Sequence, residues 1–269
     1  MDIAALLPAL LMGILEGLTE FLPVSSTGHL ILLGEAIGFQ GPPEKTFEIG
    51  IQLGAILAVT WAYRHDLVAI LTGMWRPNTV ERFVAMNLLL AFLPALVIGA
   101  TLHSTVTQLL FNPTVVCWAL ILGGIALILI ERLRPTPTIG SIAEVGPLAA
   151  VLVGFGQVLA MIPGTSRSGA TIIAALLLGV ERRAAAEFSF LLAIPTMAAA
   201  TAYSLYKARD ALHVADLGQI GVGFVTAFVV ALIVVRTMLR VINRIGFAPF
   251  GWYRIVVGAG MLVWLYTRQ

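Results

Sequence analysis

The sequence carries little charge for its length. Of its 269 residues, 11% are charged and 59% are hydrophobic, whereas a soluble domain typically has about 25% charged residues. This number of charges is too small to cover the surface of a soluble protein of this size. We therefore expect an all-α polytopic membrane protein in contact with membrane lipids. The formal net charge of +2 is too small to suggest a nucleic-acid partner.

The sequence also has a single cysteine, Cys117. One cysteine excludes an intramolecular disulfide and a thiolate-rich metal site. Because Cys117 lies in an apolar run, we interpret it as a packing residue. The N-terminal segment has no basic stretch before it reaches Glu16, so no cleaved signal peptide is predicted.

Long hydrophobic runs make up most of the chain. Six of them approach the roughly 17–25 residues of a membrane-spanning helix, and they cover residues 47–64, 84–102, 113–131, 187–206, 217–235 and 250–267. Two further stretches, 3–38 and 144–179, are each interrupted by a polar, proline-containing motif. Because each fragment is too short to cross comfortably, we predict six transmembrane helices plus two re-entrant helix pairs.

The two interrupted stretches are related to each other. A shift of 141 residues, without a gap, matches Gly13 to Gly154, Glu16 to Gln157, Gly28 to Gly169, Gly38 to Gly179 and Phe47 to Phe188. We interpret the chain, residues 1–269, as a single integral membrane domain with a first repeat at about 1–135 and a second at about 140–269. Each repeat has three spans, an odd number, so the second enters the membrane from the opposite side. Such inverted-topology repeats place their sites near the midplane, where the halves meet.

Positive charge is unevenly divided between the two faces of this topology. Ten arginines between Arg64 and Arg244 fall on one face, with Arg167 and Arg254 set aside because they lie in a motif and in a span. The other face receives Lys45, Lys207, Arg209 and Arg268. The positive-inside rule makes the arginine-rich face cytoplasmic, so both termini are expected on the periplasmic or extracellular side.

The segment EGLTEFLPVSSTGHL, residues 16–30, begins with two acidic groups. Glu16 and Glu20 are four residues apart and share one helical face. Two carboxylates at membrane depth make sense if they bind a divalent cation or if one of them is protonated. Mg²⁺ is usually held by one or two carboxylates plus substrate phosphate oxygens. The alternative is a pair that faces a wet cavity without a catalytic role.

Hydroxyl groups and a histidine follow Pro23, which ends the first helix of this motif. Ser25, Ser26 and Thr27 can cap the next helix, whose first N–H groups can also bind an anion such as phosphate. Capping alone explains any one of the three. His29 adds a group that exchanges a proton near neutral pH, and a serine with a histidine is the minimum for an activated nucleophile.

The matching segment, PGTSRSGAT at residues 163–171, is basic where the first motif is acidic. Gln157 stands in the place of Glu16. Gly164 allows the backbone to approach a ligand closely. The second half therefore supplies an anion-binding loop without the carboxylates of the first.

Arg167 is the central residue of this second loop. It lies between Ser166 and Ser168 and needs an anionic partner at membrane depth, and guanidinium matches phosphate oxygens in a bidentate way. The alternative is a structural salt bridge from Arg167 to Glu16 or Glu20. Such a bridge could exist in the empty protein and open to admit phosphate. Together the two motifs indicate phosphoryl chemistry on a molecule that arrives through the lipid.

The two motifs resemble those of the undecaprenyl-diphosphate phosphatase family, also called bacitracin-resistance proteins. FEIGIQLGAILAV (47–59), EFSFLLAIPTMAAATAY (187–203) and PFGWYRIVVG (249–258) are similar to that family too. The resemblance implies hydrolysis of undecaprenyl diphosphate to the monophosphate, which recycles the carrier of cell-wall synthesis. It also implies a divalent cation, Mg²⁺ or Ca²⁺, and a bacterial plasma (inner) membrane location.

Carried over by position, the resemblance implies a role for each polar residue. Glu16 and Glu20 would bind the metal and the diphosphate, and Ser26 would be the nucleophile. His29 would act as its base or acid, while attack by a metal-activated water is the alternative to a phosphoserine. The groups expected to bind or neutralise the phosphate are Ser25, Thr27, Gln157, Gly164, Ser166, Arg167 and Ser168.

A transporter or flippase of a phosphate-headed lipid is the competing class, because inverted repeats with broken helices are typical of transporters. A transporter needs an anion site but neither a nucleophile nor a metal, so the Glu16–Glu20 pair and His29 favour hydrolysis. The expected partners are the polyprenyl diphosphate substrate and membrane lipids, with a homodimer left open.

Overall fold

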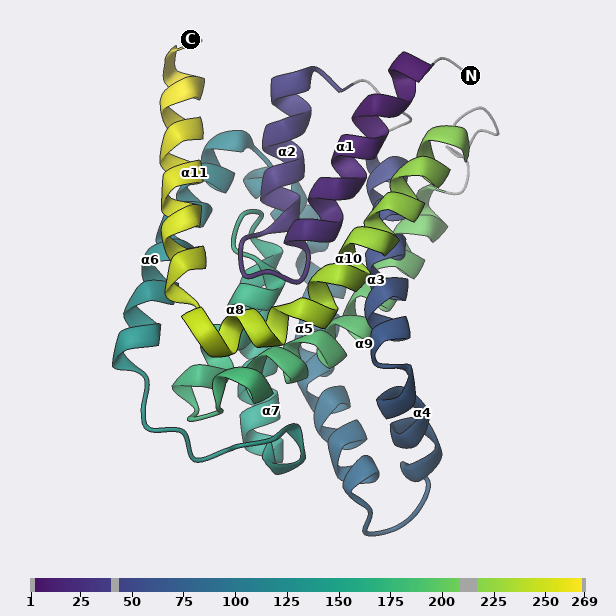
Figure 1. The fold of residues 1–269 in the computed structure, drawn as a ribbon, viewed down its shortest axis with the longest axis vertical. Helices are drawn as coiled ribbons and strands as arrows, with labels where there is room; N and C mark the ends of the chain where they lie inside the picture. The colour runs from purple at the N-terminus through teal and green to yellow at the C-terminus, as the bar shows by residue number, and fades with distance from the viewer. Residues whose placement is uncertain (1–2, 40–43, 209–216, 268–269) are drawn as a thin grey trace.

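A computed structural model describes residues 3–39, 44–208 and 217–267. Within these ranges the chain is built from helices, with one isolated β-bridge between Ile139 and Val180. Figure 1 shows the helices gathered into one body, with the start of α1 and the end of α11 on the same side. The predicted all-α polytopic architecture is confirmed. Arg209 and Arg268, which entered the orientation argument, lie outside the described residues.

The two halves have a similar order of long helices, with α4 as an additional helix in the first half and η1 and η2 as additional 3-10 turns in the second. The first half contains α1 (Ile3–Thr19), α2 (Ser26–Ile37), α3 (Glu44–Ala62), α4 (Arg64–Gly73), α5 (Val80–Leu110) and α6 (Pro113–Leu133). The second half contains η1 (Ile142–Glu144), α7 (Pro147–Val158), η2 (Leu159–Met161), α8 (Arg167–Leu177), α9 (Arg182–Ala208), α10 (Leu217–Ile245) and α11 (Ala248–Thr267).

The membrane-spanning helices lie where the six hydrophobic runs were predicted, although their ends differ. Among the described residues, α5, α6, α9, α10 and α11 are each long and apolar enough to cross a membrane alone. α3 and α4 give a sixth span only when they are taken together, and the chain bends by 74° between them. The bend falls at Tyr63, where the apolar run ends and Arg64 and Asp66 begin the polar first turn of α4.

Four shorter helices form the two re-entrant pairs. α1 has 17 residues, α2 and α7 have 12 each and α8 has 11, so at about 1.5 Å per residue none spans a hydrocarbon core of roughly 30 Å. Figure 1 shows α1 and α2 meeting at a loop in the middle of the molecule, whereas α7 enters from the opposite end. The two loops therefore meet deep inside the protein.

The re-entrant pairs have matching backbone conformations. Ser25 and Ser166, 141 residues apart, precede α2 and α8 with positive φ angles of 74° and 76°. Gly38 and Gly179, also 141 residues apart, follow these helices with φ angles of 61° and 79°. These correspondences agree with the predicted inverted repeat, which stays a prediction.

Each re-entrant pair packs against the other half of the chain. α1 lies against α10, and α7 lies against α5. The α1–α10 contact depends on small residues: a Cβ added at Gly13 would lie 2.6 Å from the Gly223 carbonyl oxygen, and one at Gly17 would lie 2.8 Å from that of Ala227. Glycine at both positions lets the helix backbones approach closely. The re-entrant pair of each half is therefore held in place by a spanning helix of the other half.

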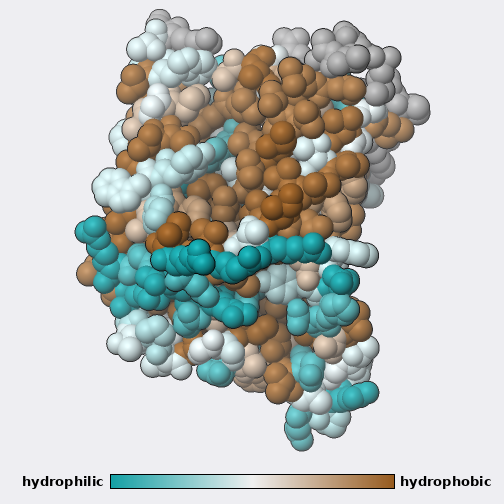
Figure 2. Space-filling model, in the orientation of Figure 1, coloured by the Kyte–Doolittle hydropathy of each residue, from teal (hydrophilic) through white to brown (hydrophobic). Residues whose placement is uncertain are grey.

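The surface divides by hydropathy. Figure 2 shows a broad hydrophobic area toward the end where α1 begins, and a hydrophilic belt below it, at the level where α9 begins and α10 ends. Exposed arginines at these two helix ends are Arg183, Arg236, Arg240 and Arg244. The belt matches the arginine-rich face that the sequence predicts to be cytoplasmic.

Candidate active site

The first re-entrant loop brings its polar residues into the interior. Glu16 and Glu20, at the end of α1 and just beyond it, are 2% and 8% exposed. The turn that follows gives Ser25 a positive φ, and the Ser25 hydroxyl accepts a hydrogen bond from the Gly28 N–H at 3.3 Å. Ser25 therefore caps α2, and the cap fixes the direction in which Ser26, the first residue of α2, presents its side chain.

The second loop repeats this arrangement. Ser166 caps α8 by accepting a hydrogen bond from the Gly169 N–H at 3.1 Å. Arg167 is the first residue of α8, in the position that Ser26 has in α2. Gly164 turns the chain with a φ of 94°. The same local geometry thus presents a hydroxyl in one half and a guanidinium in the other.

Glu20 joins the two loops. The Ser26 hydroxyl donates a hydrogen bond to Glu20 Oε2. Arg167 Nη2 donates to Glu20 Oε1 at 3.0 Å and forms an ion pair with it. Arg167 Nη1 donates to the Ser189 carbonyl oxygen, and the guanidinium lies over the Phe21 ring. The predicted salt bridge between the halves is present, with Glu20 rather than Glu16 as its acidic partner.

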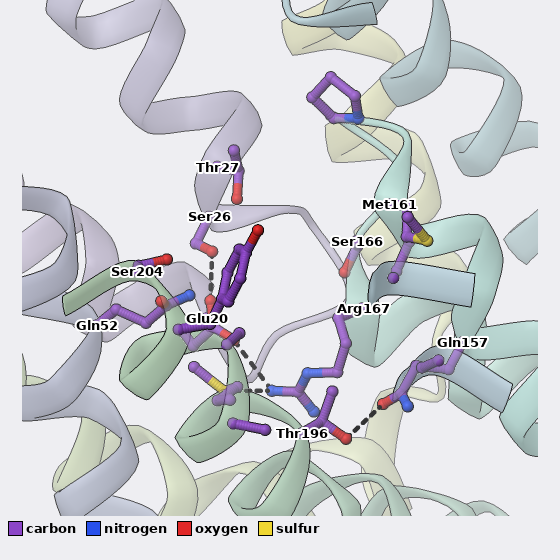
Figure 3. Close-up of a pocket in the computed structure, with 18 of the residues that line it drawn as sticks. Glu20, Ser26, Thr27, Gln52, Gln157, Met161, Ser166, Arg167, Thr196 and Ser204 are labelled. Carbon is purple, nitrogen blue, oxygen red and sulfur yellow. Dashed lines mark hydrogen bonds and ion pairs between the residues drawn. The ribbon is translucent and has the colours of Figure 1, made fainter. Parts of the chain in front are cut away.

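A pocket of about 420 Å³ opens beside this hydrogen-bonded group. Figure 3 shows Ser26 above Glu20 and Arg167 reaching Glu20 from the other side, with Gln157 and Thr196 nearby. Most of the predicted site residues line it. Those on its wall are Glu20, Ser25, Ser26, Thr27, Gln157, Gly164, Ser166 and Arg167.

Gln157, on the pocket wall, has a side-chain hydrogen-bond donor without a partner among the described residues. Its side chain is buried, and Nε2 has no hydrogen-bond partner among the described residues. Its Oε1 accepts a hydrogen bond from the Thr196 hydroxyl at 3.4 Å. An amide donor that is buried without a partner is destabilising, so a ligand oxygen fits this position.

Three predicted site residues do not line the pocket. Ser168 is fully buried and donates to the Leu22 carbonyl oxygen at 2.8 Å, so it links the loops. Glu16 is absent from the wall, and its Oε1 has no hydrogen-bond partner among the described residues. The third is His29, which lies one turn into α2.

His29 contacts groups other than Ser26. Its Nδ1 lies 2.7 Å from the Ser25 carbonyl oxygen, and its Nε2 lies 2.9 Å from the Tyr253 hydroxyl. The two rings are stacked with their centroids 5.5 Å apart. Within the described part of the chain, the hydroxyl of Ser26 is therefore paired with Glu20 and not with His29.

Comparison with known proteins shows the family of the chain. The family model described as "Bacitracin resistance protein BacA" matches residues 9–260. The chain belongs to this family. Similar proteins include undecaprenyl-diphosphatase 2 of Paramagnetospirillum magneticum, which is 52% identical to this chain. The undecaprenyl-diphosphatases of Sphingopyxis alaskensis and Aromatoleum aromaticum are 52% and 49% identical to it. The matches cover 98%, 95% and 100% of this chain and 100%, 96% and 97% of the relatives.

The structure of this BacA family member also adds residues that the sequence analysis missed. Gln52, Thr196 and Ser204 put further polar groups on the pocket wall. The sequence gives little indication of such residues, because a single polar side chain in an apolar helix commonly forms a hydrogen bond to the backbone of its own helix. Thr196 does so with the Leu192 carbonyl oxygen.

Arg254 is the most informative of the missed residues. Its side chain is completely buried and donates to four carbonyl oxygens at 3.0–3.3 Å. Two of these belong to the re-entrant loops, at Pro23 and Gly164, and two belong to α6, at Ala119 and Leu120. Arg254 thus holds both loops against one spanning helix. A charge within a predicted span was the available signal.

Proposed function

We propose that the chain is a membrane-bound polyprenyl-diphosphate phosphatase, which hydrolyses undecaprenyl diphosphate to undecaprenyl phosphate and inorganic phosphate. The observation that carries this proposal is the meeting of Ser26, Glu20 and Arg167 on one pocket wall. They supply a nucleophile, a proton acceptor and a phosphate-binding cation. The activity recycles the lipid carrier of peptidoglycan synthesis and supports cell shape and resistance to bacitracin, in line with the names of the relatives.

In the proposed reaction Ser26 attacks the terminal phosphorus. Its hydroxyl proton passes to Glu20 Oε2, which already accepts its hydrogen bond. The Oγ–phosphorus bond forms as the bond from phosphorus to the bridging oxygen breaks, and undecaprenyl phosphate leaves. Water then attacks the phosphoserine, the proton on Glu20 returns to Ser26, and inorganic phosphate and a proton are released.

Arg167 and the loop donors stabilise the charge of the transferred phosphoryl group. Phosphoryl transfer depends mainly on positioning and on neutralising the charge of the oxygens. When substrate binds, Arg167 donates to these oxygens in place of one of its contacts with Glu20. Glu20 is then free to accept the Ser26 proton. Thr27, Ser166 and the unpartnered Gln157 Nε2 supply further donors around the pocket.

His29 takes a positioning role in this proposal. The general base in contact with Ser26 is Glu20, whereas His29 contacts the Ser25 carbonyl oxygen beside the nucleophile. Direct attack by water, with Glu20 as base, is the remaining alternative to the phosphoserine. A Ser26→Ala variant separates the two routes, because only the phosphoserine route needs the hydroxyl.

A divalent cation fits the acidic side of the site. Glu16 and Glu20 supply two buried carboxylates, and the unpartnered Oε1 of Glu16 is a suitable ligand atom. The described residues offer no cluster of three or more His, Cys, Asp or Glu ligands, so substrate phosphate oxygens would complete the set of ligands, as they commonly do for Mg²⁺. The bound cation would neutralise the diphosphate charge.

The proposed location is the bacterial plasma membrane, the inner one where there are two, with both termini outside. The arginine belt at the start of α9 supports this orientation. The pocket wall includes Gly99 and Tyr203, which lie toward the C-terminal ends of α5 and α9. On α9 this is the end away from the arginine belt. The site therefore opens toward the outer face. Whether the chain forms a homodimer, which the sequence leaves open, is tested by its molecular mass in detergent.

Phosphate release by the purified chain in detergent tests the proposed function. We expect phosphate from undecaprenyl diphosphate when Mg²⁺ or Ca²⁺ is supplied, and loss of release with a chelator. A flippase or transporter releases none, because detergent removes the two sides of the membrane. Release by wild type but not by Glu20→Gln, prepared identically, excludes a contaminating phosphatase.

A further inference from the structure

The pocket has an apolar end that the chemistry of the phosphate group does not use. Beyond the polar loops, its wall continues between α5 of the first half and α9 of the second. The side chains there are mostly apolar and small: Phe92, Ala95, Leu96, Gly99 and Ala100 on α5, and Met197, Ala199, Ala200 and Tyr203 on α9. We name this part of the pocket the α5–α9 groove.

Gly99 is one of the helical glycines that no other helix approaches closely, as are Gly221 and Gly260. A Cβ added there would have nothing within 4 Å, whereas one added at Gly13, Gly17 or Gly258 would meet another helix at 3.1 Å or less. Gly99 therefore does not serve close packing within the chain. A glycine in a helix is less stable than alanine, and at Gly99 the missing side chain leaves the groove open.

The groove continues directly into the polar site. The same pocket wall carries Gln157, which is 2% exposed and whose Nε2 has no hydrogen-bond partner among the described residues. The pocket is thus polar and cationic at one end, at Arg167, and apolar at the other. This polarity suits an amphiphile with an anionic head group.

The groove also reaches the surface that faces lipid. Leu96 and Tyr203 are 41% and 45% exposed, and Phe111 at the end of α5 is 47% exposed. A volume of about 420 Å³ lies at the lower end of the range that encloses a drug-sized ligand. It therefore takes a diphosphate and the beginning of a chain, and a longer chain must continue into the membrane.

We propose that the α5–α9 groove binds the first isoprene units of the substrate and that Gly99 keeps this path open. The inference rests on the proposed function and adds the place and the residue that select a lipid-linked diphosphate. From Phe92 to Gly99 the helix rises about 10 Å. A side chain added at position 99 would therefore contact the isoprenoid chain of the substrate and leave its phosphate groups in place.

Gly99→Leu tests the proposal, with Gly260→Leu as the matched control. Gly260 lies exposed on the spanning helix α11, outside the pocket, and a Cβ added there also has nothing within 4 Å. We expect Gly99→Leu to raise the KM for undecaprenyl diphosphate at least tenfold while kcat stays within twofold of wild type. Gly260→Leu should leave both unchanged. An unchanged KM in Gly99→Leu, or an equal rise in Gly260→Leu, overturns the proposal.

A second variant gives a readout that does not depend on activity. Gly99→Cys is introduced with Cys117→Ala and alkylated with a maleimide after purification, so that folding precedes modification. Undecaprenyl phosphate should slow the alkylation at least fivefold, and inorganic phosphate at the same concentration should not. Equal rates with and without the lipid overturn the groove assignment. Failure of wild type to release phosphate overturns the proposed function instead.

Discussion

At the scale of single residues, Glu20 holds the site together. One of its oxygens accepts a hydrogen bond from the Ser26 hydroxyl, and the other forms an ion pair with Arg167. The Arg167 guanidinium, whose Nη2 lies 3.0 Å from Oε1, gives the buried carboxylate a partner of opposite charge. The same contact orients the Arg167 guanidinium toward the pocket. Loss of the Glu20 charge should therefore affect both proton transfer and phosphate binding.

The variant Glu20→Gln keeps the size of the side chain and removes its charge and basicity. We expect kcat for phosphate release to fall by about 100- to 10,000-fold, the usual contribution of a general base. Steady-state kinetics measure this, with Glu35→Gln as control, because Glu35 is exposed on α2. Turnover close to wild type in Glu20→Gln would refute the role of Glu20 as base.

At the scale of elements, the caps of α2 and α8 decide where the reactive groups point. Ser25 and Ser166 combine a positive φ, unfavourable for residues other than glycine, with a side-chain hydrogen bond that satisfies a helix N–H. Two features of one residue thus act in opposite directions on stability. This combination separates the effects of alanine and glycine substitutions.

Ser166→Ala should destabilise the protein by about 1 kcal/mol, because it removes the cap and keeps the unfavourable φ. Ser166→Gly should be less destabilising, because glycine adopts a positive φ freely. Thermal unfolding in detergent gives the order of the two variants. The predicted repeat requires the same order for Ser25→Ala and Ser25→Gly, and the opposite order at either position contradicts the capping account.

Arg254 acts between elements. Its four hydrogen bonds join both re-entrant loops to α6, and each hydrogen bond from a charged group contributes about 1.5–3 kcal/mol. Arg254→Met should lower the thermal midpoint strongly, and Arg254→Lys, with fewer donors, should fall between it and wild type. Arg236→Met, on the exposed face of α10, is the control. An Arg254→Met protein as stable as wild type would show that these hydrogen bonds do not hold the loops.

At the scale of the whole molecule, orientation follows from α9. Arg183 and Lys207 are exposed residues near its two ends. In intact cells of a strain whose outer membrane is permeabilised, a membrane-impermeant maleimide should label Lys207→Cys. Arg183→Cys should react only after the plasma membrane is opened. Cys117 is buried and should give little background. The reverse pattern of labelling would contradict the proposed orientation.

Much of the fold could be predicted from the sequence, because the bilayer imposes a length and a hydropathy on each span. The ends of the helices could not. α10 continues to Ile245, ten residues past the predicted end at 235, because arginines continue the helix beyond the apolar run. The bend at Tyr63 also went unpredicted, since helix direction depends on tertiary packing and not on hydropathy.

The site was predictable in its composition but not in its pairing. Glu20, Ser26 and Arg167 come from two motifs that were expected to meet, and they do. The partner of His29 was not predicted, because Tyr253 is 224 residues away in the chain. The inward direction of Ser168 depends on the turn at Ser166, which sequence spacing does not reveal.

The most direct test of the central claim is phosphate release by purified Ser26→Ala, prepared free of other phosphatases. If Ser26 is the nucleophile, kcat for undecaprenyl diphosphate falls by at least about a thousandfold. The control Ser141→Ala, which makes the same change outside the pocket, should keep the wild-type rate. A Ser26→Ala enzyme that retains most of its kcat would contradict the account and assign the attack to water.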